Sequence, residues 1–292
     1  MRFVRSNRYF RVGGDICTAW LYLPEGTVRP PVLVMAHGFS AERSFRLPAY
    51  AEKFAEAGIA VFVFDYRNFG DSSGMPRNLV DPARHLEDWE AAIVCVKDLP
   101  EVDGARLALW GSSFSGGHVI EMAARHPEIK ALVAQVPYVG GVKITLSLPM
   151  KVKAALAVLK DKVKGAFGGA HMIPAVGAPG QFGCMMAEEA KEFLDLVPPD
   201  SNWENKVPAR ILTKLGAYEP RKVAENVRCP ALIVLAEKDQ ITPPDLAREA
   251  ADKMQKVAIA SYDCGHFGVY QGALFEDVAA RELDFLKQYL AV

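Results

Sequence analysis

The sequence has 292 residues, of which 50% are hydrophobic and 24% are charged, and its formal net charge is −1 at pH 7. These values are typical of a globular protein with a large core, and they give no indication of nucleic acid or an anionic membrane surface as a partner. No apolar run is long enough to predict a membrane span, and the basic N-terminal residues are not followed by the apolar stretch of a secretory signal.

The five cysteines are scattered along the chain at Cys17, Cys95, Cys184, Cys229 and Cys264. Their number is odd, and their spacing predicts neither a disulfide framework nor a metal site. We therefore expect a reducing, cytoplasmic location, and we expect no metal and no cofactor.

The N-terminal part of the chain predicts β-strands around one helix. Residues 9–23 hold two short strand-like segments that suit an edge meander. Residues 31–36 and 59–64 are continuous apolar runs, which is typical of parallel strands buried on both faces. Between these runs, residues 44–57 have helical spacing, and Gly58 provides the stop.

Strand and helix continue to alternate up to residue 136. A helix is predicted from the Asp81-Pro82 start to Asp98, because this pair suits an N-cap followed by proline in the first turn. A strand over 106–110, a helix over 114–126 and a strand over 131–136 follow. This order predicts an α/β fold with a mostly parallel sheet and helices on both faces.

Residues 140–222 interrupt the alternation because they contain no long apolar strand. They hold a lysine-rich amphipathic helix at about 149–164 and a second helix at about 185–196. The loop 165–183 between them is rich in Gly, Ala and Pro. We interpret this segment as a helical insertion that caps the site.

The alternation resumes with a strand over 230–236, a helix over 243–254 and a last strand over 256–262. An amphipathic helix over about 274–290 closes the chain. The predicted core domain therefore consists of residues 1–139 and 223–292.

Polar residues follow the predicted strands: His37-Gly38-Phe39, Asp65, Ser113, Asp239 and His266. The carboxyl ends of parallel strands meet at one edge of an open sheet, where ligands bind. We therefore expect these positions to lie close together. Serine, acid and histidine come in the order Ser113, Asp239, His266, which is the order found in one serine-hydrolase fold.

Along nearly its whole length the sequence resembles the α/β-hydrolase superfamily. Gly111-Ser112-Ser113-Phe114-Ser115 is similar to the nucleophile elbow, with serine in the fifth position where glycine is usual. His37-Gly38-Phe39 resembles the oxyanion loop, and the segments around Asp239 and His266 resemble the acid and base loops. The resemblance is to serine hydrolases with a helical cap, which include esterases, thioesterases, dienelactone-hydrolase-like proteins and peptidases.

Steric requirements select Ser113 among three nearby serines. The residues two before and two after the nucleophile must be small, and for Ser113 these are Gly111 and Ser115. The corresponding neighbours of Ser112 are tryptophan and phenylalanine, which are too large. Ser115 lies one turn into the predicted helix, so we expect Ser112 and Ser115 only to cap or pack.

His266 is the predicted general base, because it would take the proton of Ser113 and later donate it to the leaving group. The other histidines are placed less well. His37 is expected to have a structural role on the oxyanion loop, and His85 is expected on a surface-type helix. Cys264 is expected to be a buried structural cysteine, because no base is left to activate its thiol.

Asp239 is the predicted acid that orients the imidazole and stabilises the imidazolium. Its alternative role is that of a turn residue that caps the following helix. Asp65 is the rival acid, but it follows an earlier strand and is expected to brace its loop through Arg67. Glu237, two residues before Asp239, is a weaker rival.

Backbone N–H groups of Phe39 and Phe114 are the predicted oxyanion hole. Four apolar side chains are predicted to line the substrate pocket: Phe39, Phe114, Phe182 and Met185. The expected reaction is hydrolysis of a carboxylic ester or thioester of a small to medium, partly apolar molecule. A peptidase or amidase, an acyltransferase and a ligand-binding protein without turnover remain open alternatives. A homodimer also remains open.

Overall fold

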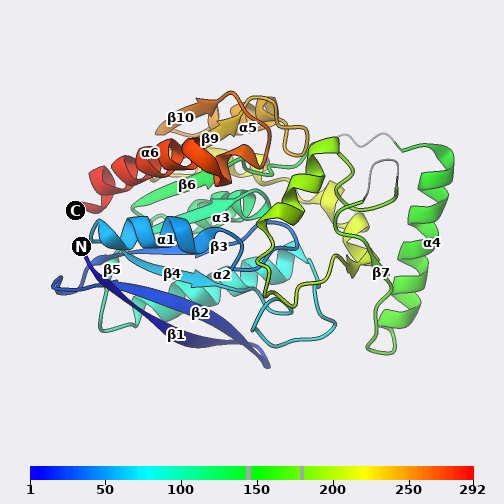
Figure 1. Ribbon diagram of the computed structural model, residues 1–292, viewed down its shortest axis with the longest axis horizontal. Helices are drawn as coiled ribbons and strands as arrows, with labels where there is room; N and C mark the ends of the chain where they lie inside the picture. The colour runs from blue at the N-terminus through cyan, green and yellow to red at the C-terminus, as the bar shows by residue number, and fades with distance from the viewer. Residues whose placement is uncertain (143–145, 178–180) are drawn as a thin grey trace.

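The computed structural model describes residues 1–142, 146–177 and 181–292. In this part of the chain the main sheet has eight strands in the order β1-β2-β4-β3-β5-β6-β9-β10 (Figure 1). The strands are β1 Phe3–Val12, β2 Asp15–Pro24, β3 Pro31–Ala36, β4 Ala60–Phe64, β5 Asp103–Ser112, β6 Ala131–Gln135, β9 Ala231–Ala236 and β10 Val257–Tyr262.

Along the sheet from β4 to β10 each strand is parallel to the next, whereas β2 is antiparallel to both of its neighbours, β1 and β4. Every residue of β3, β4, β6 and β9 is buried, which is why these strands read as uninterrupted apolar runs. The expected α/β fold with a mostly parallel sheet is confirmed.

The N-terminal hairpin is longer than the sequence predicted. β1 and β2 pair in register from Phe3 opposite Pro24 to Val12 opposite Asp15, and Gly13 turns the chain with φ +59°. The first half of β1 is mostly exposed and lacks an apolar run, so sequence pattern alone placed its start too late. The hairpin forms the sheet edge, as expected.

Helices cover both faces of the sheet (Figure 1). Buried side chains of α2, α3 and α5 join the core on one face, and those of α1 and α6 join the core on the other. The bounds of these helices are α1 Leu47–Glu56, α2 Pro82–Lys97, α3 Phe114–Arg125, α5 Pro244–Ala251 and α6 Gly272–Leu290.

The segment between β6 and β9 contains α4 Leu148–Gly165 and a small antiparallel pair, β7 Met172–Ile173 with β8 Val207–Pro208. The remaining elements are short 3₁₀ helices: η1 Glu188–Leu196, η2 Ala209–Thr213, η3 Leu215–Ala217, η4 Pro220–Lys222 and η5 Ala224–Asn226. The expected loop 165–183 includes residues 178–180, which lie outside the described residues.

The second helix expected in this segment is a 3₁₀ helix and begins later than expected, at Glu188. The side chains that η1 buries most fully on the core side are Ala190, Phe193 and Leu196, which lie three residues apart. This spacing matches the three residues per turn of a 3₁₀ helix, so the tighter helix points all three inward.

Candidate active site

Ser113 occupies a strained turn between β5 and α3. Its φ is +56° and its ψ is −119°, a combination uncommon for residues other than glycine. Its N–H donates to the Gln135 carbonyl, and its carbonyl accepts from the Tyr138 N–H, both at 2.8 Å. A Cβ at Gly111 would lie 2.3 Å from the Ser115 carbonyl oxygen, so only glycine fits there. This packing holds the serine at the end of β5, as in a nucleophile elbow.

The side chains of Ser113, His266 and Asp239 form one hydrogen-bonded chain. Ser113 Oγ lies 3.0 Å from His266 Nε2, and His266 Nδ1 lies 2.6 Å from Asp239 Oδ2. Asp239 stands after β9 and His266 after β10, so three separate strand ends supply the three groups. These distances are those needed for a nucleophile, its base and a group that orients the base.

The carboxylate of Asp239 is held from several sides. Its Oδ1 accepts from the N–H groups of Ile241 at 2.8 Å and Thr242 at 2.7 Å, and its Oδ2 accepts from Thr242 Oγ1 at 2.7 Å. Burial alone would raise the pKa of this carboxyl, but attraction to His266 and these hydrogen bonds outweigh it and hold the pKa below its usual value. Asp239 thus acts as a turn residue and faces the imidazole as well.

The loop after β3 packs directly against the serine. A Cβ at Gly38 would lie 2.9 Å from Ser113 Cβ, so the backbone of this loop approaches the elbow closely. The Phe39 N–H donates to no acceptor among the described residues. Phe114 is the first residue of α3, where the N–H has no intrahelical partner. Both groups are therefore available beside Ser113, and their role as an oxyanion hole stays a prediction.

A small cavity of about 30 Å³ opens beside Ser113 and His266. Phe39 and Met185, two of the predicted pocket residues, line it. Its other apolar lining residues are Ala41, Phe45, Leu47, Phe193, Leu196, Phe267 and Tyr270. The cavity is therefore largely aromatic, and η1 of the insertion supplies part of its wall.

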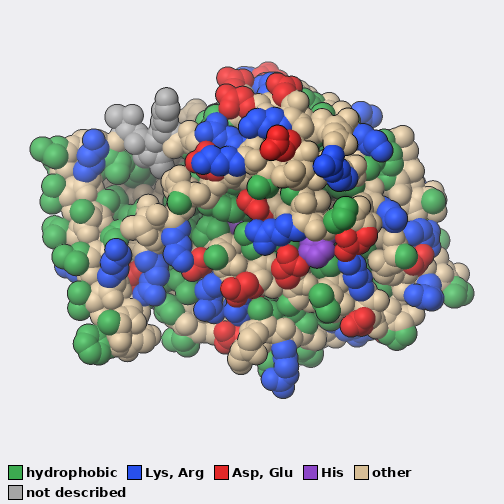
Figure 2. Space-filling view, turned by 180° about the vertical axis from the view of Figure 1, so that it is seen from behind, with side chains coloured by type: hydrophobic (Ala, Val, Ile, Leu, Met, Phe, Trp, Pro, Cys, Tyr) green, Lys and Arg blue, Asp and Glu red, His purple; other side chains and the backbone are tan. Residues whose placement is uncertain are grey.

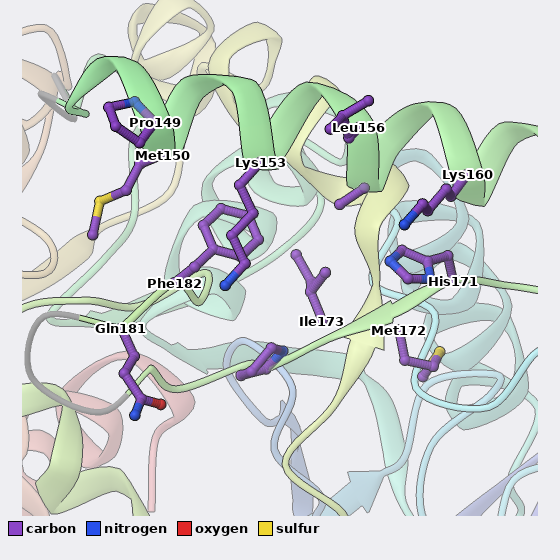
Figure 3. A pocket seen from close by; sticks show the side chains of 12 residues that line it. Pro149, Met150, Lys153, Leu156, Lys160, His171, Met172, Ile173, Gln181 and Phe182 are labelled. Atoms are coloured by element: carbon purple, nitrogen blue, oxygen red, sulfur yellow. The ribbon is translucent and has the colours of Figure 1, made fainter.

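The other two predicted pocket residues do not line this cavity. Phe182 lines a separate cavity of about 710 Å³ under α4, where Lys153 Nζ lies 5.4 Å from its ring centre (Figure 3). The Phe114 ring packs in the core against Tyr138 and Tyr218, with ring centres 5.3 and 5.5 Å away. The placement of Phe182 depends on how the insertion folds, and that of Phe114 on contacts with Tyr138 of the core and Tyr218 of the insertion; no local pattern encodes either.

Glu189 of η1 is a site residue that the sequence analysis missed. Its two carboxylate oxygens accept from the backbone N–H groups of Gln240 and His266, the latter at 3.0 Å. A Cβ at Gly265 would lie 2.2 Å from Glu189 Oε2. One buried carboxylate therefore joins the Asp239 loop to the His266 loop. The only sequence signal for it is the glycine directly before His266.

Two interpretations of flanking residues were wrong. Asp65 forms an ion pair with the guanidinium of Arg43 and also accepts the backbone N–H of Arg43 at 2.7 Å. Arg67 instead pairs with Asp88. His85 is buried rather than at the surface, and burial lowers its pKa well below the usual value. The surroundings of both Asp65 and His85 depend on residues from other parts of the chain, and sequence spacing does not reveal such contacts.

Other candidate nucleophiles and bases are disabled by burial. Burial lowers the pKa of His118 to about 3 and also lowers that of His37, so both imidazoles are neutral at pH 7. Cys264 is half-buried rather than fully buried as expected, and this partial burial still raises the pKa of its thiol to about 11. Among described residues, His266 is the histidine placed to serve Ser113.

The described residues contain no cluster of three or more His, Cys, Asp or Glu side chains arranged to hold a metal ion. Within the same residues, no helix combines the length and apolar character that crossing a membrane requires.

The elbow, the acid and base loops and the topology all match one fold, and comparison with known proteins identifies the family. The family described as serine aminopeptidase, S33 (Hydrolase_4) matches residues 29–266. The chain belongs to this α/β-hydrolase family. It is therefore a hydrolase enzyme, as the sequence predicted.

Relatives of this S33 α/β-hydrolase cover nearly its whole length. The quorum-quenching protein AidA of Acinetobacter baumannii is 36% identical over 94% of this chain and 92% of its own. The thiohydrolase aneE of Aspergillus aculeatus is 28% identical over 93% of this chain and 89% of its own. The crystal structure of the α/β-hydrolase GrgF from Penicillium covers 99% of this chain and 100% of its own, with 25% identity and a TM-score of 0.85.

Proposed function

We propose that the protein is a serine hydrolase that cleaves carboxylic esters or thioesters through an acyl-serine on Ser113. The observation that carries this proposal is the Ser113–His266–Asp239 chain at a strained strand-to-helix turn. The similarity to a thiohydrolase supports thioesters as one of the two proposed substrate classes.

In the acylation step, His266 Nε2 takes the proton of Ser113 Oγ while Oγ bonds to the substrate carbonyl carbon. The carbonyl oxygen becomes an oxyanion, to which Phe39 and Phe114 would donate their backbone N–H groups. The intermediate collapses when the bond to the leaving oxygen or sulfur breaks. The proton held by His266 passes to that leaving group, while Asp239 stabilises the imidazolium.

In the deacylation step, water replaces the alcohol or thiol. His266 takes one proton of the water, whose oxygen bonds to the acyl carbon. The acyl–Oγ bond then breaks, and the proton returns from His266 to Ser113. A carboxylic acid leaves, and the enzyme is restored without any cofactor in the scheme.

The site favours an apolar acyl group, because phenylalanine and leucine side chains dominate the cavity wall. We also propose that residues 140–222 act as a cap on the core formed by 1–139 and 223–292. Met185, Phe193 and Leu196 of this insertion line the cavity, which supports a role in setting substrate size. The five cysteines are free thiols, which supports our proposal of a cytoplasmic location.

The experiment is a panel of p-nitrophenyl esters and acyl thioesters with acyl chains of two to twelve carbons. We expect turnover of apolar acyl groups and at least about a 10³-fold loss of turnover in Ser113→Ala. Ser112→Ala is the control and should retain most activity. Equal hydrolysis by wild type and Ser113→Ala would overturn the proposal.

Peptide hydrolysis is the second candidate, because the family is described as serine aminopeptidase. An aminopeptidase needs a free acidic anchor for the substrate amino group. The buried carboxylate beside the site, Glu189, already accepts two backbone N–H groups. Aminoacyl p-nitroanilides in the same panel distinguish the two functions, and preferential cleavage of these amides would favour the peptidase.

A further inference from the structure

α4 presents an apolar face that no other described element covers. Among its 18 residues, only Ala157 and Asp161 are buried. Figure 1 shows α4 at one end of the molecule, with the rest of the insertion between it and the sheet. Its exposed large apolar side chains are Leu148 (75%), Val152 (51%), Leu156 (52%), Leu159 (59%) and Val163 (56%), and Phe167 just beyond the helix is 88% exposed.

These side chains form one stripe along the helix. At about 100° per residue, Leu148, Val152, Leu159 and Val163 fall within a narrow sector, and Leu156 lies at its margin, where it also borders the cavity under α4. The opposite sector carries Ala157 and Asp161, which face the protein. The stripe is therefore the outer face of a helix that is anchored by its inner face.

Lysines border the stripe on both sides. By the same helical geometry, Lys151 and Lys162 lie on one flank, and Lys153, Lys160 and Lys164 lie on the other. All five are exposed. Figure 2 shows hydrophobic side chains along the edge of the molecule that α4 forms, with lysine or arginine side chains beside them.

α4 exposes no acidic side chain among these residues. Asp161, its single acid, is buried and accepts hydrogen bonds from the Arg210 guanidinium and from the His171 N–H. The helix is therefore strongly basic in a chain whose net charge is −1. Two of the lysines, Lys153 and Lys160, also border the cavity under α4 (Figure 3).

We propose that α4 docks on the surface of an anionic lipid bilayer, with its axis in the plane of the interface. An apolar stripe with basic flanks is the pattern of helices that insert their apolar face among lipid chains while lysines reach the anionic headgroups. The long lysine stems allow the ammonium groups to remain at the headgroup level. This surface inference goes beyond the proposed function and does not depend on it.

Charge argues against a second copy of the chain as the occupant. A two-fold dimer across this face would place the same stripe opposite itself and bring two sets of five lysines together. No exposed acid of α4 could compensate them. An anionic bilayer supplies the opposite charge and apolar contact at once.

The test is sedimentation of the full chain with vesicles of phosphatidylcholine alone or with about one third phosphatidylglycerol. We expect clear binding to the anionic vesicles, weakened by salt and by removal of the anionic lipid. Val152→Ser with Leu159→Ser should lower the partition coefficient at least about tenfold. Lys151→Gln with Lys160→Gln and Lys162→Gln should weaken it while leaving the stripe intact.

Val94→Ser is the matched control, because Val94 is 58% exposed on α2, away from α4. It should bind vesicles like the wild type. All variants should turn over a soluble p-nitrophenyl ester at the wild-type rate, so loss of vesicle binding is separable from loss of activity. The proposal would be overturned if the wild-type protein did not bind anionic vesicles. A stripe variant that binds like wild type, or that only converts a dimer to a monomer in ultracentrifugation, would also overturn it.

Discussion

Glu189 is a single carboxylate that accepts N–H groups from the two loops carrying Asp239 and His266. Only 8% of the residue is exposed, so its hydrogen bonds are protected from water. Its position ties the geometry of the acid and the base to a segment of the insertion. We therefore treat Glu189 as a positioning residue that acts through its neighbours.

Glu189→Gln should lower kcat by roughly 10- to 100-fold, because a glutamine amide can accept from only one of the two N–H groups and small displacements at a reacting centre are costly. KM should change little. The neighbouring Glu188 is exposed, so Glu188→Gln is the control. Steady-state kinetics on one ester checks this result, with the thermal unfolding midpoint as a measure of folding. Matching kcat values for the two variants would refute the positioning role.

At the scale of the elements, the elbow depends on the close approach of β5 to α3. Gly111→Ala should abolish activity and destabilise the protein, because its Cβ would clash with the Ser115 backbone. Gly216→Ala is the control, since a Cβ there meets nothing within 4 Å. Turnover and the unfolding midpoint would be measured for both. A Gly111→Ala enzyme with normal turnover would contradict the packing described for the turn.

The parallel strands and their helices could be predicted because buried strands and amphipathic helices carry strong local patterns. The triad positions followed from the rule that strand ends share one edge, together with the order of Ser113, Asp239 and His266. The partner of Asp65 and the position of Phe182 could not be predicted, because both depend on contacts between elements distant in sequence. The role of Glu189 could not be predicted for the same reason, because its contacts with Gln240 and His266 are distant in sequence.

At the scale of the whole molecule, net charge conceals local charge. The value of −1 gave no reason to expect an anionic surface as a partner, because acids elsewhere offset the lysines of α4. The arrangement of these lysines around an exposed apolar stripe appears only once the inner face of the helix is known. A sequence-wide balance of charge is therefore a poor guide to one surface.

Folding stability should also depend on a carboxyl between α6 and β5. Glu282 is fully buried and accepts one hydrogen bond, from Trp110 Nε1 at 2.9 Å. Burial raises the pKa of this carboxyl from 4.5 to about 8. Between pH 4.5 and about 8 the carboxyl is protonated in the folded state and ionised in the unfolded state. Its contribution to the free energy of unfolding therefore falls as the pH rises through this range.

Glu282→Gln removes that titration. The difference in Tm between variant and wild type should shift in favour of the variant by roughly 2 °C or more between pH 5 and pH 9. Differential scanning calorimetry at the two pH values provides the comparison. A Tm difference that is independent of pH would show that Glu282 does not titrate with folding in this range.

The central claim is that Ser113 is the nucleophile that carries the acyl group. A fluorophosphonate probe tests it directly, because the probe forms a stable bond only with an activated serine. We predict one label per chain, mapped by peptide mass spectrometry to Ser113, and no labelling of Ser113→Ala under the same conditions. A label on another residue, or equal labelling of the Ser113→Ala protein, would contradict the account.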